Sequence, residues 1–134
     1  MLRSRFIERS FREETVQVGT ITQDIINILG ITYIKPDTPI LLGDTNIKHM
    51  QTSHPADYQK YGSHIANILC FPDYVGINKK DNSLEYVKEF EIDNEFVKVA
   101  VRISLNGNVF ARSMYILNNN RVKNFITKGT LKKV

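Results

Sequence analysis

The second half of the chain alternates between hydrophobic and polar residues, which is the pattern of half-buried β-strands. Residues 96–105 show it most clearly, because every second residue from Val97 onward is valine, isoleucine or leucine. The predicted strands are residues 73–78, 84–92, 96–105 and 109–117. Short polar links, one of them with Gly107 between two asparagines, are typical of hairpins. This half therefore predicts a four-stranded antiparallel meander.

The first half follows the period of the α-helix instead. Helices are predicted at residues 23–29, 44–54 and 55–69. The first ends at Gly30, because glycine readily adopts the left-handed backbone of a helix C-terminus. Pro55 separates the other two, because a proline disfavours the α conformation in the residue before it, here His54. In the third helix, apolar residues recur every three or four positions and predict one buried face.

Two short extended pieces, residues 31–34 and 39–42, contain or flank prolines, which confine them to a sheet edge or a loop. The predicted fold class is thus α+β, with N-terminal helices packed on a C-terminal four-stranded antiparallel meander sheet. A polar lead-in is expected at residues 1–18 and a single domain at residues 19–134.

The alternation also assigns the two faces of this sheet. One face packs on the helices and carries Val97, Val99, Val101, Ile103 and Leu105. On the opposite face, the two last strands together present Lys98, Arg102, Ser113 and Tyr115. Cations and hydroxyls of this kind suit a phosphate group. The alternative is an ordinary solvated sheet face.

Two cations interrupt faces that are otherwise apolar. Arg112 lies among Phe110, Met114 and Ile116, which are predicted to join the core face. Lys88 interrupts the apolar face of residues 84–92. Because burying a charge is costly, three explanations are open for Lys88: a bulge turns its side chain to the other face, its long side chain carries the ammonium group out to solvent, or the lysine has a function.

Composition is that of a globular protein of 134 residues, with a net charge of +4. The basic residues gather at the end of the chain, where residues 121–134 contain five and no acidic residue. This favours a polyanionic partner or, equally, a solvated tail. The single cysteine, Cys70, excludes an internal disulfide and is expected in the core. We find no signal peptide and no apolar stretch of membrane-spanning length, so the expected location is the cytoplasm.

All three histidines, His49, His54 and His64, lie in the helical half. The chain has no H-E-x-x-H, no C-x-x-C, no G-x-S-x-G and no glycine-rich phosphate loop. No metal site and no cofactor are therefore predicted, and any catalysis would use metal-free acid–base chemistry. Taken singly, each histidine is explained by a position on a helix surface or at a helix end, without a catalytic role.

A set of short motifs changes this interpretation. They are residues 47–55 (IKHMQTSHP), an apolar helix at 65–69, 71–75 (FPDYV), 86–88 (YVK), the valine-rich strand 97–102 and 113–115 (SMY). Together they resemble the phage-associated branch of the barnase, EndoU, colicin and RelE-like nuclease superfamily. The resemblance extends from about Val18 to the C-terminus. It departs from the usual pattern at Ser53, where a basic residue is frequent, and at Ser113, where threonine is common.

The resemblance implies a metal-independent endoribonuclease that cleaves RNA by attack of a 2′-OH on the phosphate, as in toxin-like effectors of phages and mobile elements. The matching site positions are His49, His54, Lys88, Arg102, Ser113 and Tyr115. The implied partners are RNA, with tRNA among the candidate substrates, and an inhibitor or immunity protein. The alternatives are a non-catalytic RNA-binding module on the same scaffold and a protein-interaction domain.

Overall fold

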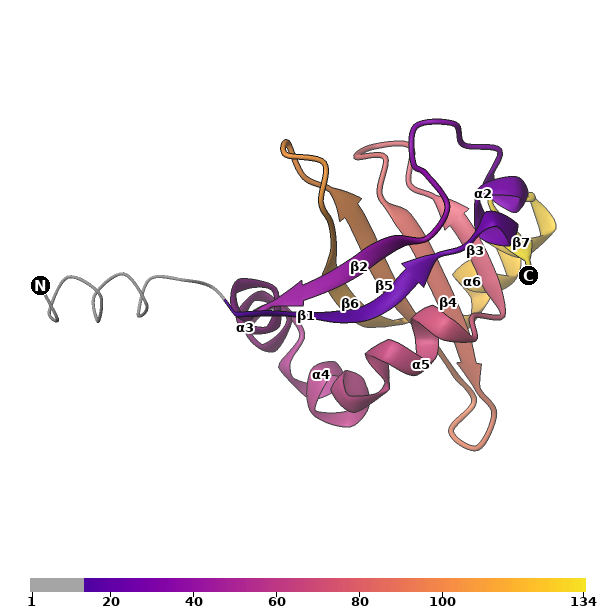
Figure 1. Cartoon of the computed structure of the whole chain (residues 1–134). Helices are drawn as coiled ribbons and strands as arrows, with labels where there is room; N and C mark the ends of the chain where they lie inside the picture. Colours follow the sequence, from indigo (N-terminus) through magenta and orange to yellow (C-terminus); the bar gives the residue numbers. More distant parts are fainter. Residues whose placement is uncertain (1–13) are drawn as a thin grey trace, which may run out of the picture.

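The computed structural model describes residues 14–134. They form a seven-stranded sheet with strand order β1-β2-β6-β5-β4-β3-β7 (Figure 1). The strands are β1 (Thr15–Ile21), β2 (Thr38–Gly43), β3 (Tyr74–Ile77), β4 (Leu84–Phe90), β5 (Glu95–Ile103), β6 (Val109–Leu117) and β7 (Leu131–Lys133). Neighbouring strands are antiparallel except β2 and β6, which are parallel.

The helices lie on both faces of this sheet. They are α2 (Gln23–Leu29), α3 (Asp44–Ser53), α4 (Pro55–Tyr61), the 3₁₀ turn η1 (Gly62–His64), α5 (Ile65–Cys70) and α6 (Asn119–Thr127). Helices α2 to α5 contribute to the main hydrophobic core, whereas α6 covers a second, smaller cluster around Val87 and Phe96. Within residues 14–134, no helix is long and apolar enough to cross a membrane.

The α+β class is confirmed, but the four-stranded sheet is wrong. Strands β3 to β6 pair antiparallel in chain order, yet the sheet extends beyond them on both sides. Strands β1 and β2 come from the half predicted to be helical, and β7 comes from the basic C-terminal segment. Strand β2 joins the meander through only two residue pairs, Ile40 with Val109 and Leu41 with Phe110. Local periodicity cannot reveal a pairing between residues so far apart in the chain.

Strand β2 was also predicted to lie at an edge or in a loop, and this is wrong as well. It lies between β1 and β6, and its Ile40 is fully buried. Pro39 pairs with Thr20 of β1 but lies just outside the two pairs shared with β6. An interior strand can accept this proline because the missing N–H falls beyond that short ladder.

The predicted boundary between residues 18 and 19 falls inside β1. This strand pairs with β2 over its whole length, with a register shift between Gln17 and Gly19. Residues 1–13 of the predicted lead-in lie outside the described residues.

The helix ends follow the predicted chemistry. Thr22 Oγ1 accepts a hydrogen bond from the backbone N–H of Ile25 at 3.3 Å, and Gly30 closes α2 with φ +67°. Helix α3 ends before Pro55, and His54 leaves the α conformation at φ −140° and ψ 68°. The proline therefore fixes the corner where His54 lies.

The long helix predicted at 55–69 is interrupted. At Tyr61 the backbone reaches φ −120° and ψ 0°, and η1 separates α4 from α5. A Cβ at Gly62 would lie 2.9 Å from the ring of Tyr58, so the glycine permits this close packing. Tyr61 of α4 and Ile65 of α5 are both buried in the main core, on either side of this break.

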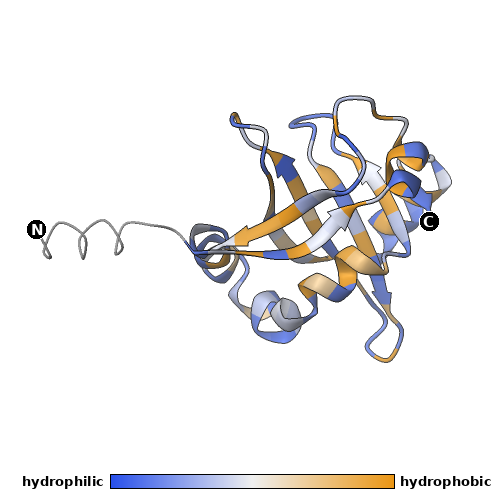
Figure 2. Cartoon of the chain, viewed as in Figure 1, coloured by the Kyte–Doolittle hydropathy of each residue, from blue (hydrophilic) through white to orange (hydrophobic). Residues whose placement is uncertain are grey.

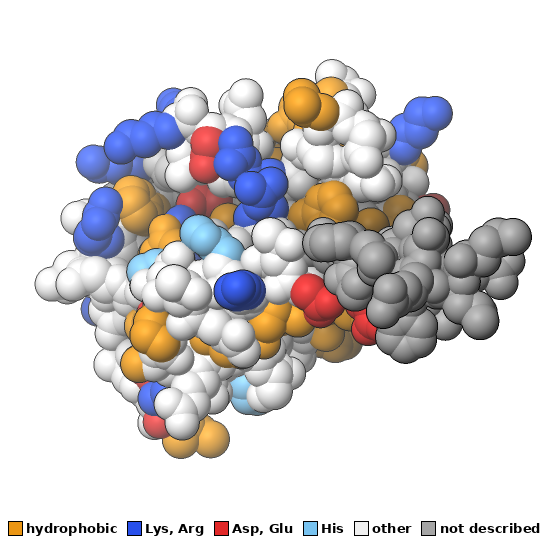
Figure 3. Space-filling view, turned by 90° about the vertical axis from the view of Figure 1, so that its left-hand side faces the viewer, with side chains coloured by type: hydrophobic (Ala, Val, Ile, Leu, Met, Phe, Trp, Pro, Cys, Tyr) orange, Lys and Arg blue, Asp and Glu red, His pale blue; other side chains and the backbone are white. Residues whose placement is uncertain are grey.

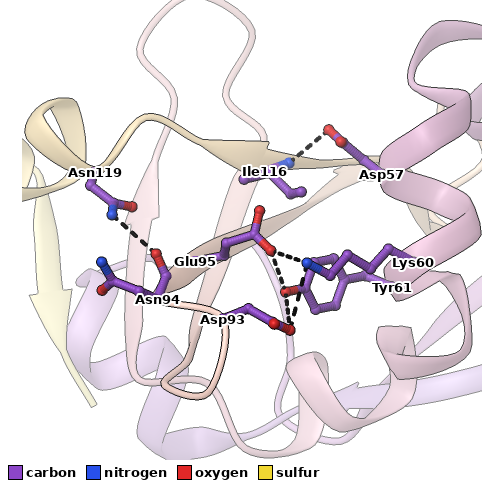
Figure 4. A network of polar contacts seen from close by, with 8 residues as sticks. All are labelled: Asp57, Lys60, Tyr61, Asp93, Asn94, Glu95, Ile116 and Asn119. Atoms are coloured by element: carbon purple, nitrogen blue, oxygen red, sulfur yellow. Dashed lines mark hydrogen bonds and ion pairs between the residues drawn. The ribbon is translucent and has the colours of Figure 1, made fainter.

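Helix α4 is tied to the sheet by polar contacts (Figure 4). The carboxylate of Glu95 accepts hydrogen bonds from Lys60 Nζ and from the hydroxyl of Tyr61, the latter at 2.8 Å. At the other end, Asp57 Oδ2 accepts from the backbone N–H of Ile116 of β6 at 3.0 Å. These contacts hold the start of α4 against β6 and its end against β5.

The predicted core face of β5 is confirmed at its centre. Val97, Val99 and Val101 are fully buried, and hydrophobic residues line the facing elements in Figure 2. Ile103 and Leu105 do not follow: Ile103 is 46% exposed and Leu105 is fully exposed, because both lie where β5 runs beyond β4 into a turn. Cys70 is also exposed rather than buried, since it ends α5 on the solvent side.

Candidate active site

A cleft of about 560 Å³ opens where α3 meets the strands β5 and β6. It brings together three of the six predicted site residues: His49 from α3, Arg102 from β5 and Ser113 from β6. We call it the His49 cleft. Thr45, Asn46, Ser104 and Phe110 also line it. Its volume lies in the usual range for ligand sites, and all of its lining residues except Ala100 and Phe110 have polar or charged side chains.

A bulge in β6 supplies the cleft with a second arginine. Ala100 is opposite Ser113, but the next residue of β5, Val101, is opposite Ala111. Arg112 is therefore the extra residue, and the alternation of β6 changes phase on either side of it. Arg112 consequently lines the His49 cleft beside Arg102.

This bulge overturns two sequence expectations. Phe110 was predicted to join the core face, but it lies opposite Arg102 and lines the cleft. Ala111, which strict alternation would place on the same face as Ser113 and Tyr115, is fully buried. The assignment of Met114 to the core is confirmed, because the pairing with β5 is regular from Ser113 to Leu117 and Met114 lies opposite the buried Val99. The sequence did contain a signal for this bulge: Arg112 stands within a run of apolar residues, and a strictly regular strand would have buried its charge at a high cost.

His54 and Tyr115 form a stacked pair in the next row of side chains along β6. Their ring centroids are 4.7 Å apart and their planes are inclined by 28°. The corner at Pro55 and the bond from Ile116 to Asp57 place His54 there. Neither His54 nor Tyr115 is among the residues that line the His49 cleft.

Lys98 lies beside Tyr115 but is not available to a ligand. It is only 8% exposed, and its ammonium group lies 2.6 Å from the carboxylate of Glu85. Burial alone would lower the pKa of Lys98, but hydrogen bonds to Glu85 and Tyr115 outweigh it and raise the pKa above its ordinary value. The predicted phosphate-binding role of Lys98 is therefore replaced by a structural one: its charge is neutralised beneath Tyr115.

Asp81 brings a carboxylate to the rim of the cleft from the turn between β3 and β4. The backbone N–H and the hydroxyl of Ser83 both donate to it, at 3.0 and 2.7 Å. These hydrogen bonds lower the pKa of Asp81, and the charge of Arg102 adds to the effect. The carboxylate therefore stays ionised, which suits electrostatic attraction of Arg102 better than proton transfer.

Seen from outside, this side of the molecule combines histidine with positive charge. Figure 3 shows histidine side chains next to lysine and arginine side chains around a hollow in the surface. The arginines that line the His49 cleft are Arg102 and Arg112, both exposed. An accessible imidazole beside two guanidinium groups can exchange a proton while a bound anion is held in place.

Comparison with known families agrees with this chemistry. The sequence profile of the family described as phage-Barnase-EndoU-ColicinE5/D-RelE like nuclease3 matches residues 16–124. The chain belongs to this family. The suspected relationship is thus confirmed, and the family name describes a nuclease of the barnase, EndoU, colicin and RelE type. No curated protein and no solved structure matches the chain significantly.

Within this nuclease fold, Lys88 lies away from the His49 cleft. It pairs with Val97, so its side chain is on the core side of the sheet, opposite to Arg102. Its ammonium group donates to the carbonyl oxygen of Phe71 at 2.8 Å, just after the C-terminus of α5. A cation at this position stabilises the end of a helix. The structure therefore gives the conspicuous lysine a capping function.

The described part of the chain, residues 14–134, has no group of three or more His, Cys, Asp or Glu side chains placed to hold a metal ion. The groups that the cleft offers for chemistry are imidazole, guanidinium, hydroxyl and carboxylate.

Proposed function

We propose that this member of the nuclease family is a metal-independent endoribonuclease that cleaves RNA by attack of a 2′-OH on the adjacent phosphate. The observation that carries the proposal is the convergence of His49, Arg102 and Arg112 in one cleft. Histidine titrates near neutral pH, and two guanidinium groups can neutralise a phosphate whose charge increases in the transition state.

The reaction needs a base, an acid and stabilisation of the phosphorane. A base removes the 2′-OH proton while the 2′-oxygen bonds to phosphorus, and an acid protonates the departing 5′-oxygen. The products are a 2′,3′-cyclic phosphate and a 5′-OH. His49 is the proton-transfer group inside the cleft, and His54, which the stack with Tyr115 orients, is the candidate for the second. Ser113 can donate a hydrogen bond to a phosphate oxygen.

The roles of the other residues follow from their positions. Arg102 and Arg112 hold the phosphate, and the charge of Asp81 attracts Arg102 at the rim of the cleft. Tyr115 acts as a positioning residue for His54, because one face of its ring is covered by the imidazole. Lys88 takes no part in the proposed chemistry, since it caps α5 on the other side of the sheet.

The decisive experiment incubates the purified protein with total RNA in EDTA and identifies the new ends. We expect cleavage with 2′,3′-cyclic phosphate at the 3′ ends. Arg102→Ala should weaken both RNA binding and cleavage, because the same guanidinium contacts the phosphate in the ground state and the transition state. Arg121→Ala is the matched control, since Arg121 lies over Phe125 on α6, outside the cleft residues.

Other outcomes separate the alternatives. Salt-dependent RNA binding without cleavage would favour a non-catalytic RNA-binding module, because counterion release makes phosphate contacts sensitive to salt. If the protein neither binds nor cleaves RNA, both the nuclease and the RNA-binding hypotheses are refuted. As part of the proposal, the protein acts as a toxin-like effector, so expression of the wild type should arrest growth and His49→Ala should not.

A further inference from the structure

A second depression adjoins the His49 cleft at the end of β5. It encloses about 300 Å³ between the loop of residues 31–37, the turn between β3 and β4, and the ends of β5 and β6. We call it the Tyr33 groove. Arg102 and Asp81 line both depressions, so the two meet at the residues proposed to hold the phosphate.

The Tyr33 groove differs chemically from the cleft, because most of its lining is apolar. Leu84, Val101 and Val109 form a buried floor. Above them, Tyr33 is 55% exposed and Ile103 is 46% exposed. Two large, half-exposed apolar side chains beside a charged cleft offer a surface that a flat or apolar group can cover, and removing that surface from water would favour binding.

The loop that carries Tyr33 is anchored at both ends. Ile31 and Ile34 are buried in the core, and the backbone N–H of Asp37 donates to Ile21 O at 2.8 Å. The residues on either side of Tyr33 are thus fixed while its ring remains accessible. Such preorganisation lowers the entropic cost of binding a partner on this ring.

Tyr115, the aromatic residue among the predicted site positions, cannot offer both faces of its ring to a base. The His54 ring covers one face at 4.7 Å, and the Lys98 ammonium group lies 4.6 Å from the ring centroid. Tyr33 carries no such neighbour among the ring contacts of residues 14–134. An accessible aromatic ring is what single-stranded RNA bases stack on.

We propose that the Tyr33 groove is a nucleobase subsite, which binds the base next to the phosphate held by Arg102. The base would stack on Tyr33 and rest against Ile103, and the exposed amide of Asn82 on the groove's rim could pair with the base edge. Because Val101 and Ile103 alternate with Arg102 along β5, the RNA turns over the end of this strand between phosphate and base. This subsite rests on the proposed function and would set the base preference at the cut.

The test titrates the full-length protein with the four nucleoside 3′-monophosphates and with inorganic phosphate, by calorimetry or amide chemical shifts. Tyr33→Ala should weaken the tightest mononucleotide by about 10-fold, within the range of one base–aromatic stack, and leave inorganic phosphate binding unchanged. Tyr33→Phe should retain wild-type affinity, because the ring remains. Phe71→Ala is the matched control: this aromatic side chain is 68% exposed and lies outside both depressions.

Asn82→Gly gives a second variant that should fold, because Asn82 already has φ +60°, a conformation that glycine adopts freely. It should reduce the discrimination between bases while the stack on Tyr33 persists. Sequencing of the ends of cleaved RNA should likewise show a weaker base preference for Tyr33→Ala than for the wild type.

The outcomes keep the subsite and the nuclease activity apart. If RNA is cleaved but Tyr33→Ala changes neither mononucleotide affinity nor base preference, the subsite is refuted and the nuclease proposal stands. If no RNA is cleaved but Tyr33→Ala selectively weakens mononucleotides, the subsite stands in a non-catalytic protein. If the wild type binds mononucleotides no more tightly than inorganic phosphate, the subsite is refuted.

Discussion

On one face of β5, Val97, Val99 and Val101 are buried against a single hydrophobic core. On the other face, Phe96 and Lys98 are also buried, but against different partners. Phe96 packs in the cluster under α6, whereas Lys98 pairs with Glu85. Only at Arg102 does this face become open to solvent.

The comparison shows that a polar face of a strand need not be a solvated face. The burial of each residue depends on what packs against it. Along β5, Phe96 packs under α6, Lys98 forms an ion pair with Glu85, and Arg102 faces the open cleft. The gradient also has a consequence for chemistry. The neutralised Lys98 supports Tyr115 and, through it, His54, while the exposed guanidinium groups of Arg102 and Arg112 lie at the open end.

The largest effect is expected from breaking the ion pair. Glu85→Ala leaves the ammonium group of Lys98 buried without its partner, which should lower the free energy of unfolding by about 3–5 kcal/mol. The double variant Glu85→Leu/Lys98→Met should recover most of this loss, because it removes both charges and keeps the volume. Urea denaturation measures both, with Glu89→Ala as the control on the same strand. A loss no larger than that of Glu89→Ala would show that this end of the face behaves as solvated surface.

The next effect concerns the open end of the same face. His49→Ala should reduce RNA cleavage by about 100-fold or more, which is the usual contribution of a positioned proton-transfer group. RNA affinity should change little, because Arg102 and Arg112 remain. His64→Ala is the matched control, since His64 lies against Tyr61 and Phe90 instead of in the cleft. Equal losses from His49→Ala and His64→Ala would contradict the assignment.

A smaller effect distinguishes the ends of the core face. Val99→Ala should lower the free energy of unfolding by about 1–3 kcal/mol, through lost transfer energy and a residual cavity. Ile103→Ala should cost less than about 0.5 kcal/mol, because Ile103 is half exposed. Thermal or urea unfolding of the two variants gives the comparison directly. Similar losses at both positions would mean that the core continues to the end of β5 in solution.

The smallest effect is a dependence of stability on alkaline pH. The folded pKa of Lys98 lies above its unfolded value of about 10.4, so its contribution is complete below that pH and is lost as the pH rises through the folded pKa. The unfolding free energy of the wild type should therefore fall relative to Glu85→Leu/Lys98→Met as the pH rises above about 10. A constant difference over this range would contradict the raised pKa.

The sequence by itself determined the local elements. The period of two along β5, the C-cap at Gly30 and the helix break before Pro55 depend on neighbouring residues and on backbone sterics, so each could be predicted from the chain. Arg102, Ser113 and His49 could be proposed as site residues for the same reason, because their residue types and motifs are local features.

The tertiary structure alone decided which of these residues meet. The bulge in β6 moved Arg112 and Phe110 into the cleft, the capping of α5 separated Lys88 from it, and β2 joined the meander through a distant pairing. Each depends on a partner far away in the sequence, whose position no local period records. A one-residue irregularity inverts every following side chain of a strand, so the chemistry of this cleft was settled by packing between distant elements.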